Sequence, residues 1–175
     1  MHLAPTSSTT ALLVLGDALA LVASRVKNYT KEDFGLHHPA GALGKKLLVR
    51  VSNIMHSGND NAIVREGCSL KQAIVEMSAK GLSMVSVVDA ENKLKGIVTD
   101  GDLRRMLERG IDVYNETVDN VMTKPPKFID EREMAVNALQ KMTDMRITGM
   151  PVLNSEGIVV GTVLMQDIYK AGIVQ

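Results

Sequence analysis

The stretch GIVTDGDL at residues 96–103 returns sixty-five residues later, in degraded form, as GTVLMQDI at residues 161–168. Each copy consists of a short apolar run followed by polar residues that are typical of a helix start. Each copy also places a carboxylate in that first turn, Asp102 in one and Asp167 in the other. This repeat predicts the architecture of the chain.

The repeat is longer than one motif. The same offset pairs Met77 with Met142, and an offset of 67 pairs the upstream Met55 with Met122. Repeated units of this kind pack against each other because neither buries its apolar face alone. We therefore predict an α/β (α+β) fold of tandem β-α-β-β-α units that form an intramolecular pseudo-dimer, with a ligand cleft between the related halves.

Local signals give the elements of each unit. Ser69 and Gln72 have the spacing of a capping box, and Gly81 is a helix stop. Alternating or continuous apolar runs mark the strands, and turn formers separate them. The expected elements are a helix at 70–80, strands at 84–88 and 94–98 and a helix at 102–109, then a helix at 134–143, strands at 149–153 and 158–164 and a helix at 166–171.

Composition narrows the possible partners. Twenty basic and twenty acidic residues leave no net charge, so bulk electrostatics favours neither a nucleic acid nor a membrane surface as a partner. The single cysteine, Cys68, excludes an internal disulfide and fits a reducing, cytoplasmic compartment. It is interpreted as a small apolar filler, because a reactive thiol needs an electropositive setting.

Residues 11–22 are almost continuously apolar. A signal peptide is a weak interpretation, because no Lys or Arg precedes the run and Asp17 interrupts it, and the run itself is too short to span a bilayer. Pro5 and the hydroxyls that follow it instead predict the start of a buried helix. A helix so apolar requires more protein around it than the next thirty residues supply.

The segment 30–44 is rich in turn formers and contains His37 and His38. A histidine before a rigid proline can serve in acid-base chemistry, but a lone histidine in a loop is more often only solvated. The four histidines lack the spacing of metal ligands, so we expect no metal site.

Two resemblances follow from these residues. The Gly-hydrophobic-hydrophobic-Thr-x-x-Asp pattern at 96–102, set in tandem units, resembles the ligand-binding signature of CBS domains. The stretches LAPTSSTT at 3–10 and HPAGALG at 38–44 resemble the end of the sugar-isomerase domain of bacterial D-arabinose 5-phosphate isomerases, which place a CBS pair after that domain. The resemblance covers essentially the whole chain.

This resemblance implies three regions: a remnant of the isomerase domain with its linker at 1–48, a first CBS domain at 49–114 and a second at 115–175. The family interconverts D-ribulose 5-phosphate and D-arabinose 5-phosphate, a supply step for the lipopolysaccharide sugar Kdo. It implies that His38 is catalytic in the parent enzyme, and that the chain assembles as a dimer of CBS pairs within a tetrameric parent. Most of the catalytic groups have no counterpart in residues 1–50, so we predict no isomerase activity for this chain alone.

Thr99 and Asp102 have two interpretations that remain open. One is a capping box that satisfies the free amides of the helix start. The other is a binding site, in which the carboxylate accepts hydrogen bonds from a ribose diol while the hydroxyl and helix amides hold a phosphate or carboxylate. In the second copy Leu164 has replaced the hydroxyl, which predicts two unequal clefts.

The resemblance to CBS pairs implies that a ligand also contacts the entry segment of each unit and the segment before the strand that follows its first helix. The candidate ligand-binding residues are Thr99, Asp102, Ser83, Met84, Met55, Arg105, Asp167, Lys124, Thr148 and Met150, with Arg104 and Arg146 as further sources of positive charge.

Two functions are compatible with these residues. In the first, no cofactor is required and the pair is a regulatory module that binds a nucleotide or nucleotide sugar, with CMP-Kdo as a feedback effector or AMP or ATP as the more usual CBS ligands. In the second, the pair binds nothing and is an oligomerisation scaffold for the isomerase domain.

Overall fold

The computed structural model describes residues 5–37 and 48–173. Each repeat forms one small three-stranded unit. The first contains β2 (Ile63–Arg65), α4 (Leu70–Lys80), β3 (Met84–Val88), β4 (Leu94–Thr99) and α5 (Asp100–Glu108). The second contains β5 (Ile129–Asp130), α7 (Ala135–Met145), β6 (Gly149–Leu153), β7 (Val159–Leu164) and α8 (Met165–Lys170). The predicted tandem β-α-β-β-α fold is confirmed.

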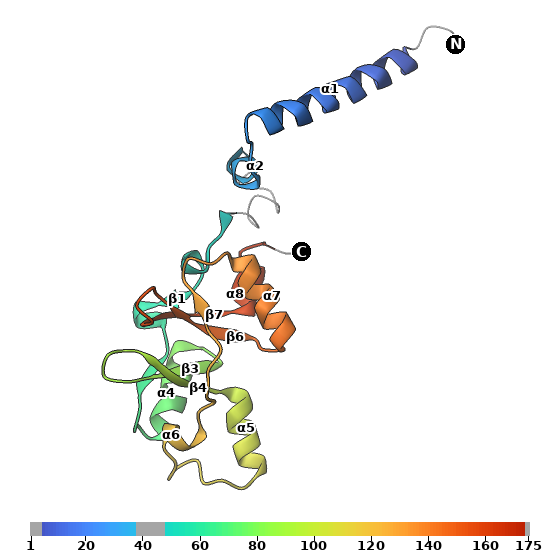
Figure 1. The fold of residues 1–175 in the computed structure, drawn as a ribbon. Helices are drawn as coiled ribbons and strands as arrows, with labels where there is room; N and C mark the ends of the chain where they lie inside the picture. Colours follow the sequence, from blue (N-terminus) through green and yellow to red (C-terminus); the bar gives the residue numbers. More distant parts are fainter. Residues whose placement is uncertain (1–4, 38–47, 174–175) are drawn as a thin grey trace.

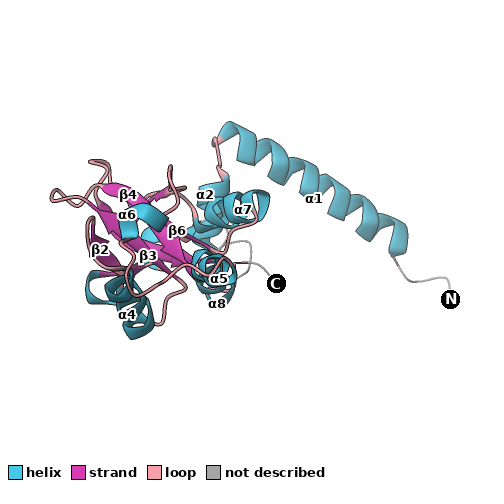
Figure 2. Ribbon diagram, turned by 90° about the horizontal axis from the view of Figure 1, so that it is seen from below, coloured by secondary structure: helices cyan, strands magenta, loops and turns pink. Residues whose placement is uncertain are grey.

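The two sheets have the same topology. β2 runs parallel to β3, which pairs antiparallel with β4; β5, β6 and β7 repeat this arrangement. The sheets of the two units lie together with the helices outside them (Figure 2). Asp89 and Asn154 begin the equivalent β-hairpin turns, and the side chain of each accepts hydrogen bonds from two backbone amides of its own turn.

The two units exchange the segments that precede them. The first lead-in segment, residues 49–57, hydrogen-bonds to the second unit through Val51 and continues as β1 (His56–Ser57), which pairs with β7. The second lead-in segment, residues 116–123, contains the short helix α6 (Val118–Val121), hydrogen-bonds to the first unit through Val118 and bridges to β4 at Thr123. Each unit is therefore completed by chain that belongs, in the repeat, to the other.

This exchange explains the first glycine of the repeated motif. A Cβ atom at Gly96 would collide with the side chain of Met122, and one at Gly161 would lie 2.7 Å from the sulfur of Met55. The methionine of each lead-in segment thus occupies the space that a side chain would take on the opposite strand. The glycine is required for this packing, whether or not a ligand binds.

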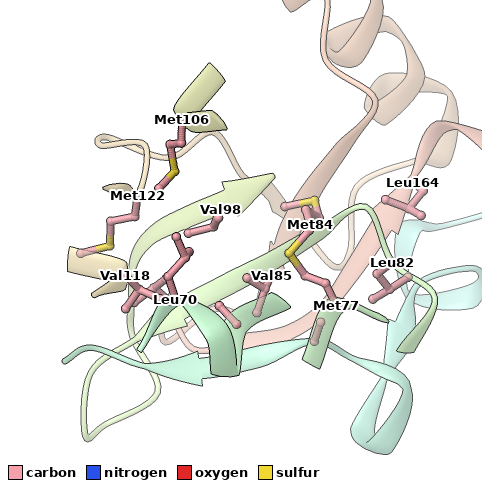
Figure 3. Packing of buried hydrophobic residues seen from close by; sticks show 13 residues of the cluster. Leu70, Met77, Leu82, Met84, Val85, Val98, Met106, Val118, Met122 and Leu164 are labelled. Atoms are coloured by element: carbon pink, nitrogen blue, oxygen red, sulfur yellow. The ribbon is translucent and has the colours of Figure 1, made fainter. Parts of the chain in front are cut away.

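The hydrophobic core also crosses between the units. The first cluster contains Leu82, Met84 and, from the second unit, Leu164, which lies beside them in Figure 3. Met122 of the second lead-in segment belongs to the same cluster. A smaller cluster of Val88, Leu153 and Val159 joins the far ends of the two sheets. The second unit has a cluster of its own, which contains Met150 and, from the first lead-in segment, Val51. Side chains of both units therefore contribute to two of the three clusters.

The N-terminal part differs from this compact pair. α1 (Thr6–Val26) is the helix that the apolar run predicts, but none of its residues is buried, and it projects away from the two units (Figure 1). The predicted helix is confirmed, and its burial by further protein stays a prediction. The helix has 21 residues, so by length and composition alone it is long enough to cross a membrane, a criterion that core helices of soluble proteins also meet.

Two local predictions need correction. The turn-rich segment after residue 30 forms a second helix, α2 (Lys31–His37), because Asp33 accepts hydrogen bonds from the backbone amide and hydroxyl of Thr30 and so caps its start. The carboxylate–amide and carboxylate–hydroxyl bonds also lower the pKa of Asp33. The helix after β4 begins at Asp100, two residues earlier than predicted, with Thr99 as its N-cap.

Candidate functional site

Two clefts lie where the two units meet, and the repeat relates one to the other. We call the first the cationic cleft. It has a volume of about 380 Å³ and is lined by Ser83, Met84, Ile97, Thr99, Asp100, Gly101, Arg104, Arg105, Thr123, Lys127, Arg146, Ile147, Thr148 and Gly149.

We call the second the apolar cleft. It has a volume of about 670 Å³ and is lined by Ile74, Met77, Ser78, Gly81, Leu82, Ser83, Asp100, Leu103, Thr148, Leu164, Met165, Gln166 and Tyr169. Ser83, Thr148 and Asp100 line both clefts and so form the wall between them. Ser83 and Thr148 are themselves equivalent positions of the repeat, which places the pseudo-twofold axis at this wall.

The equivalent positions carry different chemistry. Thr99 of the cationic cleft corresponds to Leu164 of the apolar cleft, Arg104 to Tyr169, and Arg146 to Gly81. Among the described residues that line the apolar cleft, Asp100 alone has an acidic or basic side chain. The cationic cleft shares Asp100 but has four basic side chains. The prediction that the two clefts differ agrees with this geometry.

Three of those four cations have no counter-ion. Among the described residues, Arg104, Lys127 and Arg146 form no ion pair. The fourth, Arg105, donates a hydrogen bond of 2.5 Å to Asp102. The N-terminus of α5 adds its partial positive charge, because first-turn amides point out of the helix end at Gly101. This cleft is suited to an anion such as a phosphate.

Asp102 lies beside the cleft and has two sets of partners. Its Oδ2 accepts hydrogen bonds from the backbone amide (2.9 Å) and hydroxyl (2.7 Å) of Thr99, which completes a capping box. Its Oδ1 accepts from Arg105 and, at 3.4 Å, from the hydroxyl of Thr123. Only 9% of the residue is exposed. The capping interpretation is therefore realised. Asp102 itself lines neither cleft, and a ligand could reach its Oδ1 only by displacing Arg105.

The second copy has the same arrangement with different partners. Asp167 Oδ2 accepts from the backbone amide of Leu164 at 2.9 Å and lies 3.1 Å from Nε2 of His56. His56 is the counterpart of Thr123 in the repeat, so each lead-in segment contacts the acid of the other unit. The second copy therefore keeps the hydrogen bond from the backbone amide of Leu164 to the carboxylate of Asp167, but it lacks the side-chain hydroxyl that completes a capping box.

The predicted ligand-binding residues are distributed unevenly. Thr99, Ser83, Met84, Arg105 and Thr148 all line the cationic cleft. Met150 is fully buried in the second core, Met55 packs against Gly161, and Asp167 and Lys124 line neither cleft. The predicted catalytic residue, His38, lies outside the described residues.

Lys127 was missed by the sequence analysis. It comes just after the prolines at 125 and 126, and nothing in its spacing relates it to the repeated motif. In the described ranges, no three His, Cys, Asp or Glu side chains gather as metal ligands. Cys68 is half-buried, and this burial, together with the nearby carboxylate of Asp119, raises the pKa of its thiol away from the reactive range.

Comparison with known proteins matches this fold to a family. The family described as CBS domain matches residues 51–109 and 118–173. The chain belongs to the CBS domain family. Each matched segment contains one of the two units and most of the lead-in segment before it, so the clefts lie within a CBS pair.

Curated relatives of this CBS pair are arabinose 5-phosphate isomerases named KdsD. The chain is 47% identical over 173 residues to the one from Pseudomonas aeruginosa and 43% identical over 174 residues to the one from Escherichia coli K12. Each match covers 99% of this chain and 53% of the relative. The chain therefore spans about half the length of these relatives, and the resemblance inferred from its sequence is confirmed.

Solved CBS pairs share the fold at low sequence identity. The CBS domain pair of protein MJ0100, in complex with 5'-methylthioadenosine and S-adenosyl-L-methionine, has a TM-score of 0.62 and is 24% identical, over 70% of this chain and 94% of that one. CBSX2 in complex with AMP has a TM-score of 0.60 and is 19% identical, over 71% of this chain and 96% of that one. At these identities the similarity establishes the fold alone.

Proposed function

We propose that this CBS pair is a regulatory module that binds a nucleotide or nucleotide sugar in the cationic cleft. The observation that carries the proposal is the placement of three unpaired cations, Arg104, Lys127 and Arg146, in one of two related clefts. The other cleft has none. Solved CBS pairs of the same fold are found with AMP, S-adenosyl-L-methionine and 5'-methylthioadenosine, which supports a ligand that contains a nucleoside.

The cleft offers a distinct partner to each part of such a ligand. The three free cations and the start of α5 face a phosphate or carboxylate, and charge-assisted hydrogen bonds of this kind contribute about 1.5–3 kcal/mol each. Met84, Ile97 and Ile147 supply apolar surface for a base. Arg105 is 58% exposed, so it can turn toward the anion and leave Asp102 Oδ1 to accept from a ribose hydroxyl.

The relatives suggest what the module regulates. In a full-length protein like them, the chain would control an isomerase that interconverts D-ribulose 5-phosphate and D-arabinose 5-phosphate in the cytoplasm, with His38 as a catalytic residue. CMP-Kdo, the activated product of the pathway, is then the proposed feedback effector. Its ribose suits Asp102 and its charged groups suit the cations; AMP or ATP is the alternative ligand.

Calorimetric titration of the chain with CMP-Kdo, CMP, AMP and ATP tests the proposal. We expect saturable binding of at least one of them, and no heat with either cytidine ligand would reject the feedback effector. Asp102→Ala is expected to abolish ligand-induced stabilisation, whereas the equivalent Asp167→Ala removes a similar cap without touching the cationic cleft and should retain it. Equal losses in the two variants would contradict the assignment.

The second candidate function is an oligomerisation scaffold. It is favoured by exposed apolar side chains, among them Leu12 and Leu19 on α1 and Leu107 and Tyr114 near α5. A scaffold would keep its oligomeric state in Asp102→Ala and would show no ligand effect in the unmodified chain. Sedimentation of both proteins, with and without the four ligands, separates the two functions.

We also propose that isomerase activity requires the remainder of the longer protein. The lysine and carboxylate partners expected of an aldose-ketose isomerase have no counterpart in residues 1–50, and such a reaction needs a positioned base beside the substrate carbons. A coupled assay of the 175-residue chain is expected to show no turnover. Measured turnover would overturn this proposal.

A further inference from the structure

The helix α7 joins the cationic cleft to the place where the chain enters the pair. Its C-cap is Arg146, which lines this cleft and forms no ion pair among the described residues. Its first residue, Ala135, donates its backbone amide to the carbonyl of Val49 at 2.9 Å. The helix has 11 residues, so its two ends are about 16 Å apart. One helix therefore runs from the candidate ligand site to the start of the first lead-in segment.

Residues 49–52, the start of that segment, are held against the loop that precedes α7. The backbone amides of Val51 and Ser52 donate hydrogen bonds of 2.9 and 3.0 Å to carbonyls of this loop. The side chain of Arg50 donates a further hydrogen bond of 2.6 Å to the carbonyl of Arg132 in the same loop. The chain that arrives from α1 and α2 is thus attached to the start of α7 by several hydrogen bonds.

The packing of α7 couples its two ends. Val51 is fully buried in the same cluster as Ala138 and Met142, which lie on the buried face of α7. Ile147, which follows the C-cap and also lines the cationic cleft, packs against that cluster. Close-packed interiors resist local changes of volume, so a helix in such a cluster shifts as a body, typically by about 1–2 Å. A ligand that restrains one end of α7 therefore also restrains the other end.

The equivalent helix of the first unit lacks one part of this connection. The first residue of α4, Leu70, donates its amide to the carbonyl of Glu116 beside the second lead-in segment, as Ala135 does to Val49. However, α4 ends on Gly81, which has no side chain to contact a ligand. The copy with a cation at its C-cap is the copy whose start holds the chain arriving from α1 and α2.

We propose that α7 transmits the occupancy of the cationic cleft to residues 49–52, with Arg146 as the residue that couples the ligand to the helix. This inference rests on the function proposed for the cationic cleft, and it adds the element through which the ligand acts on the N-terminal part. An anion that draws in the side chain of Arg146 restrains the C-cap. The opening of α7, and of the hydrogen bonds at its start, then becomes rarer.

Hydrogen exchange of the 175-residue chain, measured by NMR with and without saturating AMP or CMP, tests this inference. We expect the bound nucleotide to slow exchange of the Val51, Ser52 and Ala135 amides at least fivefold. Arg146→Gly keeps the left-handed C-cap, which glycine adopts freely. At saturation this variant should bind the nucleotide without slowing those three amides. Full slowing in Arg146→Gly would overturn the inference.

Arg104→Ala is the matched control, because it removes another unpaired cation of the same cleft from α5 instead of α7. It should weaken the nucleotide but keep the slowing at Val51 once the cleft is saturated. Loss of the slowing in both variants would contradict the role of α7. A chain that binds AMP or CMP without any change at Val51 rejects this inference alone, whereas a chain that binds no nucleotide rejects the proposed function.

Discussion

Arg146 adopts a left-handed backbone conformation, which residues other than glycine rarely adopt. Its φ is +55° at the C-cap of α7, in the left-handed region, and the equivalent residue of the first unit is Gly81 with φ +63°. Helices commonly end on glycine at this position because a Cβ atom costs about 1 kcal/mol there. The chain tolerates that cost at the one copy whose residue lines the cationic cleft, which is the pattern expected where strain serves binding.

Arg146→Gly is therefore expected to separate stability from binding. Removing the strained side chain should raise the free energy of unfolding by about 0.5–1 kcal/mol, because glycine enters this region freely. The same change should weaken a phosphorylated ligand about tenfold, the effect of one lost charge-assisted hydrogen bond. Urea unfolding and calorimetry measure the two effects. Gly81→Ala is the matched control, and it should destabilise without affecting the cationic cleft.

For single residues, the sequence identified Asp102 as a candidate but did not identify every residue that lines the cationic cleft. Thr99 and Asp102 stand in a recognisable pattern, and the resemblance to CBS pairs added Ser83 and Thr148, so all four were predicted near one cleft. Lys127 could not be predicted, because it reaches the cleft through an irregular segment after two prolines. The choice between a cap and a ligand site depended on which partners approach Asp102 Oδ1. One of them, Arg105, lies in the same helix, but the other, Thr123, comes from the second lead-in segment.

The exchange of lead-in segments is the feature that holds the elements together. The residues at 49–57 complete the second sheet and those at 116–123 complete the first, each through backbone hydrogen bonds and a methionine packed on a glycine. The repeat in the sequence identified both segments as equivalent. It could not show the exchange, because pairing within a unit and pairing with the sister unit give the same periodicity.

Gly96→Ala is expected to loosen this exchange. The new methyl group would collide with Met122, and overpacking of a buried contact costs about 1–3 kcal/mol. In a double-mutant cycle with Met122→Ala, the loss of the methionine side chain should remove most of the penalty of the new methyl group. Additive effects on the free energy of unfolding would mean that the two residues are not in contact.

The hairpin turn that begins at Asp89 predicts how the stability of the fold depends on pH. Hydrogen bonds from the backbone amides of Lys93 and Glu91, opposed by burial and aided by Lys95, lower the pKa of Asp89 below its ordinary value. A carboxyl whose pKa is depressed in the folded state stabilises the fold above its unfolded pKa of about 4, and this contribution is lost as the pH falls through the folded value. Asn154 makes the same turn without ionising.

Asp89→Asn is therefore expected to fold normally at neutral pH and to lose less stability than the unmodified chain between pH 5 and pH 2. Thermal unfolding at a series of pH values measures this. Asp89→Ala should lower the melting temperature at pH 7, because the turn amides lose their acceptor. An unchanged pH profile in Asp89→Asn would show that the acid destabilisation arises elsewhere, for example at Asp130. Hydrogen bonds from the side chain and the backbone amide of Arg132 lower the pKa of Asp130 to about 2.

The whole molecule consists of a compact pair and an exposed helix. None of the residues of α1 is buried. Its large apolar side chains are exposed, and Leu13 and Val22, for example, are each more than half exposed. Amphipathic periodicity is absent from this run, so the sequence predicted a helix but not what covers it. The chain spans about half the length of its curated relatives.

Deletion of residues 1–47 tests the independence of the pair. Because the described interior contains no residue of α1, the remaining chain is expected to keep its melting temperature within about 2 °C and its ligand affinity within about twofold. It should also self-associate less, since a large apolar surface has been removed. Circular dichroism and sedimentation provide the readouts. A collapse in stability would show that α1 packs on the pair.

The most direct test of the account compares two neighbouring lysines. Lys127 lines the cationic cleft, whereas Lys124, three residues earlier, lines neither cleft. Titration of Lys127→Ala and Lys124→Ala with AMP and CMP-Kdo should show at least a fivefold loss of affinity in the first and affinity within twofold of the unmodified chain in the second. Equal affinities in all three proteins, or no binding by the unmodified chain, would contradict the proposal that this cleft is an anion-selective regulatory site.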